Sequence, residues 1–214
     1  MNFNNLIVIF FLLTVFTGCT RTQETYYANG AKSSAITYRN GTPTGEATFW
    51  HPNGALMQKN TYENGMVSGR LTRWHPNGNK ELEEEYENNL RNGLAVYYNQ
   101  EGQKIREVNY KHDTLHGSYV EFFASGHIKI EGEYINGLFH GAWKWYDEDG
   151  VVLGEGNFER GNGTQTAWRR DGTLLREITY QNNQKHGVER HYNEEEKVEK
   201  EIINRKNEPR ETEN

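Results

Sequence analysis

Several residue types are scarce in this sequence, and each scarcity excludes a class of structure. The 214 residues include only 4 prolines and one cysteine, Cys19, and their mean hydropathy is −0.97. A single cysteine cannot form an intramolecular disulfide, a CxxC redox pair or a cysteine-based zinc site. A chain this polar cannot fill a thick aliphatic interior, so its apolar surface has to be spread thinly along an extended fold.

Positive charge is also scarce. Lys and Arg number 24 against 30 Asp and Glu, which gives a formal net charge of −6, and no stripe rich in Lys or Arg interrupts the pattern. Nucleic acids bind to cationic surfaces with release of counterions, so we expect no nucleic-acid partner. The same sign of charge disfavours electrostatic docking on anionic lipids.

One long apolar run is present, from Leu6 to Phe16. It is too short to span a bilayer and is typical of a secretory signal peptide. Thr17 and Gly18 then lead into Cys19, which resembles the lipobox of bacterial lipoproteins, where the cysteine is lipidated and becomes the mature N-terminus. We therefore expect a signal peptide over residues 1–18 and lipidation of Cys19, with a secreted or periplasmic protein as the alternative.

Glycine and aromatic residues, in contrast, are abundant and periodic. Six aromatic residues recur at intervals of 24 residues from Tyr38 to Phe158, and Tyr180 follows after 22. A second aromatic column and two glycine columns run in phase with them. We expect the aromatic columns to form a structural spine, in which each ring stacks on the ring of the next copy. The columns are Tyr38, Tyr62, Tyr86, Tyr110, Tyr134, Phe158 and Tyr180, and Trp50, Trp74, Tyr98, Phe122, Tyr146, Trp168 and Tyr192.

Each copy has the sequence pattern of a β-hairpin. A short run at 69–74 is followed by the turn sequence His-Pro-Asn-Gly at 75–78, a second run at 79–86, and what we interpret as a longer turn at 87–93. Glycine recurs too often for an amphipathic helix to persist. The prediction is an all-β fold: an elongated, single-layer, twisted antiparallel sheet of tandem hairpin repeats.

The repeats set the predicted organisation of the chain. After the signal peptide we expect a lipidated N-terminal linker at 19–25 and then an array of about seven near-24-residue units at 26–204. A charged tail at 205–214 has a composition compatible with disorder. No room is left for a separate catalytic domain.

A further set of aromatic residues lies outside the strict columns. Strand alternation places Trp143 and Trp145 on the face opposite to Tyr146. Because these irregular aromatic residues do not recur with the period, we expect them to bind a partner. The predicted partner-binding residues are Phe49, Tyr97, Tyr119, Trp143 and Trp145.

No residue pattern points to catalysis, a metal or a cofactor, and we expect none. His51 and His75 occupy one position of the repeat, and His116, His140 and His186 occupy another. Residues that recur with the period are expected to belong to the scaffold. The acidic clusters lack the Asp-x-Asp-x-Gly spacing that wraps a calcium ion.

The segments Gly65–Gly78 and Gly137–Gly150 share the pattern Gly-x-x-x-Gly-x-x-x-x-aromatic-x-x-x-Gly, which resembles the MORN repeat. The spacing and the closing tyrosine resemble its bacterial variant, found in YwqK-type antitoxin proteins. In three copies Asn89, Asp113 and Asn183 replace the first glycine, and these residue types tolerate the left-handed backbone that a turn requires.

This resemblance implies an elongated, twisted antiparallel sheet that binds proteins or membranes. Together with the predicted lipobox, it favours a non-enzymatic lipoprotein of the bacterial cell envelope. We expect that it scaffolds a protein or glycan partner and touches the membrane through its lipid anchor alone. The alternative is an antitoxin or immunity protein that neutralises a cognate toxin.

Overall fold

The structure, a computed structural model, describes residues 20–205 and 208–212. The predicted signal peptide and Cys19 lie outside the described residues. Those that are described form 17 β-strands, and they include no helix with the length and hydropathy to cross a membrane. The predicted all-β fold of tandem antiparallel hairpins is confirmed. The chain divides into two compact units, one up to Gln103 and one from Lys104.

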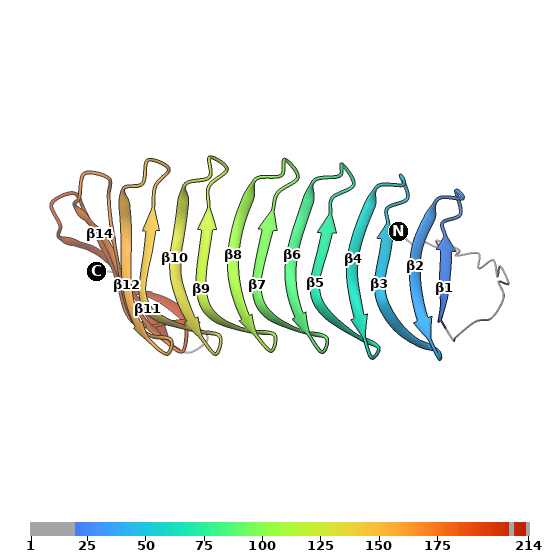
Figure 1. The fold of residues 1–214 in the computed structure, drawn as a ribbon. Coiled ribbons are helices and arrows are strands. Elements are labelled where there is room, and N and C mark those ends of the chain that lie inside the picture. Colours follow the sequence, from blue (N-terminus) through green and yellow to red (C-terminus); the bar gives the residue numbers. More distant parts are fainter. Residues whose placement is uncertain (1–19, 206–207, 213–214) are drawn as a thin grey trace. The chain divides into compact units, whose positions relative to one another are not determined.

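Within each unit, every strand pairs in antiparallel fashion with the next strand along the chain (Figure 1). The first unit holds β1 Thr20–Tyr26, β2 Lys32–Arg39, β3 Thr42–Trp50, β4 Leu56–Glu63, β5 Met66–Trp74, β6 Lys80–Glu87 and β7 Leu90–Tyr98. The second unit holds β8 Lys104–Lys111, β9 Thr114–Phe122, β10 Ile128–Ile135, β11 Leu138–Tyr146, β12 Val152–Glu159, β13 Asn162–Trp168, β14 Leu174–Gln181, β15 Gln184–Tyr192, β16 Val198–Arg205 and β17 Glu208–Thr212.

The turns at one end of the hairpins contain two residues, both in the left-handed region. Asn64 and Gly65, for example, have φ of 51° and 82°, the combination that a type I′ turn requires. The residues that replace glycine keep this geometry, since φ is 68° at Asn89 and 63° at Asn183. The longer turn predicted at 87–93 is wrong: Asn88 and Asn89 alone make the turn, and β7 begins at Leu90.

The glycine column that includes Gly45 forms β-bulges instead of turns. Gly45 has φ of 69°, and the register shifts so that the three residues Thr44–Glu46 lie opposite Thr37 alone. The shortened sixth copy has no such shift, because β12 and β13 pair regularly from Gly154↔Ala167 to Glu159↔Asn162. The two residues missing from this copy are therefore the two extra residues of the bulge.

Both ends of the array extend further than the sequence predicts. Thr20–Tyr26 form β1, paired with β2, so the segment 20–25 is a strand and not a linker. The segment Glu208–Thr212 forms β17, paired with β16, so part of the predicted tail belongs to the sheet. Main-chain pairing with a neighbouring hairpin requires no apolar side chain, which explains how such polar segments are ordered.

Strand alternation divides the side chains between two faces. We call one the buried face, because it carries most of the buried residues, among them Ala47, Leu71, Trp143 and Ile178, which are 0 to 8% exposed. The other is the open face, which carries exposed residues such as Ala142. Each unit is a single layer of strands, and its core is the row of side chains along the buried face.

Candidate functional site

The five predicted partner-binding residues all lie on the buried face. Phe49, Tyr97, Tyr119 and Trp145 are partly exposed there, but Trp143 is only 3% exposed. The indole ring of Trp143 lies directly over Gly132, where an added Cβ would come within 2.2 Å of the ring, and its Nε1 donates to the carbonyl oxygen of Glu133 at 3.1 Å. Trp143 therefore belongs to the core of the second unit and is not an accessible binding residue.

An aromatic cluster surrounds Trp143. The ring centroids of Tyr119, Tyr134 and Phe139 lie 5.6, 5.1 and 4.7 Å from that of Trp143. Phe139 continues the cluster to Phe158 at 5.3 Å. Burial raises the pKa of Tyr134 to about 12. Phe139 was missed by the sequence analysis, although it stands at the position that Val67 and Leu115 occupy in other copies.

The predicted spine is split between the two faces. The column of Tyr62, Tyr134 and Phe158 shares the buried face with the predicted binding residues, whereas the column of Trp50, Tyr146 and Trp168 lies on the open face. The spine is thus two separate rows, and ring contacts in the second unit join the first row to Trp143.

Tyrosines of the open-face column donate hydrogen bonds to glutamates that precede them by 15 residues. The hydroxyl of Tyr146 donates to Glu131 at 2.5 Å, and burial together with this bond raises the pKa of Tyr146 to about 12. The hydroxyls of Tyr98 and Tyr192 make the equivalent bonds to Glu83 and Glu177. These glutamates are therefore already engaged by the scaffold.

The repeating histidines tie neighbouring copies together. Nε2 of His51 lies 2.7 Å from the carbonyl oxygen of Trp74, and Nε2 of His75 lies 3.3 Å from that of Tyr98. Tyr27 holds the same position in the preceding half copy and makes the same type of bond. The interpretation of His51 and His75 as scaffold residues is confirmed. Over the described part of the chain, no group of three or more potential metal ligands is assembled.

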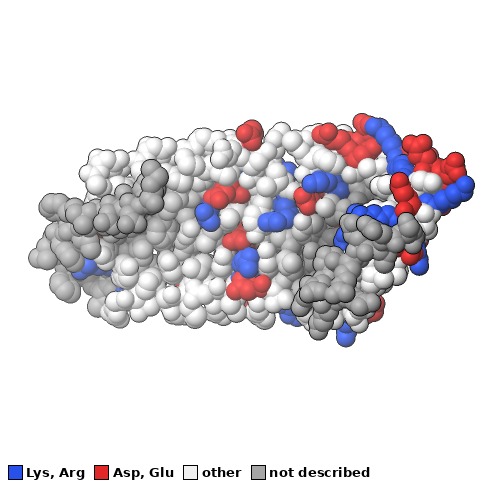
Figure 2. All heavy atoms as spheres, turned by 180° about the vertical axis from the view of Figure 1, so that it is seen from behind, with Lys and Arg blue, Asp and Glu red and all other residues white. Residues whose placement is uncertain are grey.

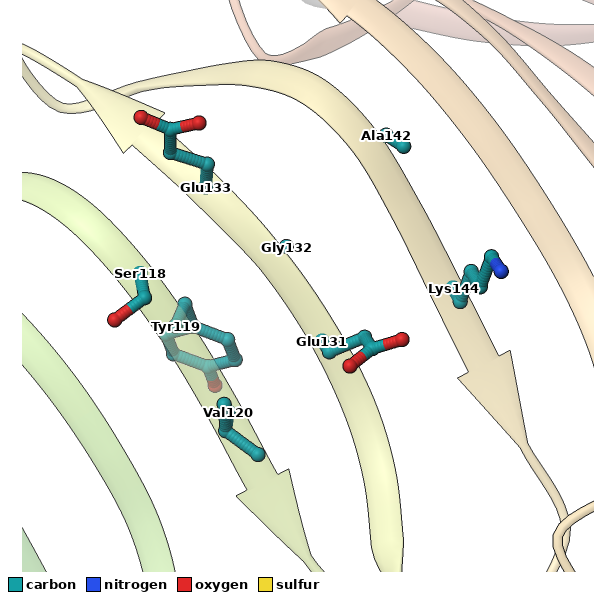
Figure 3. A pocket seen from close by; sticks show the side chains of 8 residues that line it. All are labelled: Ser118, Tyr119, Val120, Glu131, Gly132, Glu133, Ala142 and Lys144. Atoms are coloured by element: carbon teal, nitrogen blue, oxygen red, sulfur yellow. The ribbon is translucent and has the colours of Figure 1, made fainter.

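A groove crosses the open face of the second unit. It consists of two neighbouring hollows with volumes of about 560 and 320 Å³, which share Ala142 and Lys144. Figure 3 shows the first hollow, where Ser118, Glu131 and Glu133 stand around the floor made by β10. The second hollow reaches from β11 to β13 and adds Glu155, Asn157, Thr164, Thr166 and Trp168.

Two charged side chains of the groove are not used by the scaffold. Lys144 stands opposite Glu131 on one side and Glu155 on the other, yet within the described residues neither Lys144 nor Glu155 has an ion pair or a side-chain hydrogen bond. This site was not predicted from the sequence. Its residues come from several copies and include small polar types that carry no motif.

Comparison with known families gives a match to a repeat family. The profile of a family described as "MORN repeat variant" matches residues 43–64, 68–88, 91–112, 115–136 and 139–160. Each matched segment covers the second strand of one hairpin and the first strand of the next, with the five-residue turn between them. Where a bulge is present, it lies within the earlier of these two strands. No curated protein matches the chain.

Proposed function

Because the chain belongs to the MORN repeat variant family, we propose that it is a non-enzymatic binding module that presents the open face of its second unit to a protein or glycan partner. MORN repeats generally serve as modules that bind proteins or membranes. The individual repeat is a single-layer hairpin, which offers a broad surface and little enclosed volume. Such a surface suits recognition better than chemistry that depends on a secluded site.

The observation that carries this proposal is the contrast between engaged and unengaged polar groups. Period-repeating groups such as His51 and Glu83 are tied into the scaffold. Lys144 and Glu155 are unengaged among the described residues and lie in the groove. On the face that Figure 2 shows, acidic and basic side chains lie next to one another.

We further propose that the module is a lipoprotein of the bacterial envelope, anchored through Cys19. β1 begins at Thr20, directly after this cysteine, so a lipid there would hold the first unit close to the membrane surface. Cys19→Ser is expected to move the protein from the membrane fraction to the soluble fraction and to abolish incorporation of labelled palmitate. Equal fractionation of both forms would favour the secreted alternative.

Affinity capture from native envelope tests the binding function. The chain from Thr20 onward serves as bait, and mass spectrometry identifies what it retains. A partner retained by the wild type and lost with Lys144→Ala, but kept with Lys59→Ala on the open face of the first unit, is the expected result. A toxin as the dominant partner would instead establish the immunity function. A bait that retains nothing specific contradicts the proposal.

A further inference from the structure

Glu155 lies beside a residue of the open-face column that has no hydroxyl, Trp168, as Glu107 lies beside Phe122. Glu107 has an ion pair with Lys104 at 2.5 Å, whereas Glu155 has none in the described structure. In the copies that carry Tyr98, Tyr146 or Tyr192, the column residue donates its hydroxyl to the glutamate on the preceding strand. Trp168 has no hydroxyl, and Glu155, which occupies the glutamate position of this copy, is exposed. Glu155 therefore offers both carboxylate oxygens beside an indole ring in the second hollow.

The remaining lining of the second hollow consists of further hydrogen-bonding groups. Asn157 and Thr164 are exposed and lie opposite each other on β12 and β13, and Thr166 lies opposite Glu155. These side chains supply an amide and two hydroxyls, and Lys144 supplies an ammonium group from β11. The hollow thus combines one aromatic surface with neutral and charged hydrogen-bonding groups. Its volume is of the size that small ligands occupy.

The geometry points to a short neutral glycan as the ligand of this groove, an inference that rests on the binding function proposed above. The indole of Trp168 offers a flat apolar surface for the C–H face of a sugar ring. The carboxylate of Glu155 accepts bonds from sugar hydroxyls, while Asn157, Thr164 and Lys144 can donate to ring and hydroxyl oxygens.

A peptide fits the same groove less well. β11, β12 and β13 are each paired on both sides, so no strand edge is free there to bind a peptide main chain. Trp168 is the one large apolar side chain on the open face of the second hollow, whereas a peptide needs several apolar anchors. Sugar hydroxyls, in contrast, find partners along the whole floor.

Isothermal titration of the full chain with chitotriose, cellotriose and maltotriose tests this inference. At least one of these probes is expected to bind, and Glu155→Gln and Trp168→Ala should each weaken its binding by about tenfold or more. Glu107→Gln and Trp50→Ala are matched controls, because these residues occupy equivalent positions outside the groove. They should leave the affinity unchanged.

Unfolding curves of the four variants show whether each remains folded. If Trp168→Ala unfolds, Glu155→Gln decides the outcome, because it retains the size of an exposed side chain. No binding of any probe, or binding that Glu155→Gln and Trp168→Ala leave intact, overturns the glycan assignment. The binding function itself survives such a result if affinity capture still retains a partner that depends on Lys144, so the two failures are distinguishable.

Discussion

Gly132 controls the packing of the buried face at the scale of a single residue. The ring of Trp143 occupies the space in which any other residue would place its Cβ, with ring atoms 2.2 to 2.6 Å from that position. Gly132 does not need a left-handed backbone, so its role is to leave room. The largest side chain of the aromatic cluster can therefore lie flat on the sheet.

Replacing Gly132 with alanine is expected to destabilise the second unit by about 1 to 3 kcal/mol, because the added methyl group pushes the indole out of its position. Urea unfolding followed by tryptophan fluorescence measures this change. Thr164→Ala, on the open face of the same unit, serves as the control and should change stability by less than about 0.5 kcal/mol. Equal stability of Gly132→Ala and the wild type would show that Trp143 is not fixed by this contact.

Glu189 is a buried carboxylate surrounded by nitrogen-bearing side chains. It is 3% exposed, and its oxygens lie 2.8 Å from Nζ of Lys185, 3.1 Å from Nε2 of His191 and 3.7 Å from Nη1 of Arg176. Burial raises the pKa of Glu189, but the hydrogen bond from Lys185, the bond from Asn204 and the charge of Arg176 outweigh it, so the pKa lies below its usual value.

A lowered carboxyl pKa stabilises the folded state at a pH above the unfolded pKa of about 4.3, and this contribution is lost as the pH falls through the lower pKa of the folded state. At pH 7, Glu189→Gln is expected to reduce the free energy of unfolding by about 1 to 2 kcal/mol. The difference from wild type should shrink below pH 4. Urea titrations between pH 3 and 7 test this, with the exposed Glu199→Gln as a control that shows no pH-dependent difference.

The roles of individual residues could be predicted only in part from the sequence. The period identified His51 and His75 as scaffold residues, because a side chain that bonds each copy to the next must recur with the repeat. It could not identify the groove, because Glu155 has the same residue type as Glu107 and Glu131 in its column and differs from them only in its partners. Nor could it show that Trp143 is buried, because this depends on a glycine on another strand.

At the scale of the hairpin, the chain uses positive φ for two purposes. Gly65 lies in a two-residue turn and Gly69 in a bulge four residues later, with φ of 82° and 75°. Glycine spacing predicts both positions but not which of the two structures each forms, because turns and bulges place the same demand on the backbone. The turn predicted at 87–93 is wrong for this reason.

The turn at Asn182 and Asn183 connects hairpins that are not neighbours. Asn183 accepts a hydrogen bond from the amide of Phe139 at 2.8 Å through Oδ1, and its Nδ2 donates to the carbonyl oxygen of Gly137 at 2.8 Å. Gly161, in the intervening hairpin, leaves room for this contact, since an added Cβ would lie 2.8 Å from Oδ1 of Asn183. The tips of three hairpins are thereby joined at the shortened copy.

Asn183→Gly keeps the left-handed backbone and removes both side-chain bonds. We expect it to destabilise the second unit by about 1 to 3 kcal/mol. Asn182→Gly is the matched control, because it changes the other residue of the same turn, where φ is also positive and the side chain makes no hydrogen bond in the described structure. A similar loss of stability in both variants would mean that the flexibility of the turn, and not the side-chain hydrogen bonds of Asn183, determines the effect.

At the scale of the whole molecule, the hydrogen bonds between copies mostly join each copy to the next one. Asn53 donates to the carbonyl oxygen of Pro76, and Asn77 donates to that of Gln100, in each case 23 residues further along. The backbone amide of Asn89 likewise donates to the carbonyl oxygen of Val67. The stability of such an array is approximately a sum of contributions from each repeat and from each contact between neighbouring repeats. The destabilising effect of a local substitution should therefore decrease with distance along the array.

Trp74→Ala tests this expectation. Loss of the ring from the open face is expected to destabilise its hairpin by about 3 kcal/mol, and hydrogen exchange measured by mass spectrometry should accelerate in β4, β5 and β6. Exchange in β14 and β15 should stay unchanged, because no tie in the described structure joins those strands directly to Trp74. Uniformly faster hydrogen exchange across both units would instead mean that the repeats unfold cooperatively. A destabilising substitution anywhere in the array would then also destabilise the groove.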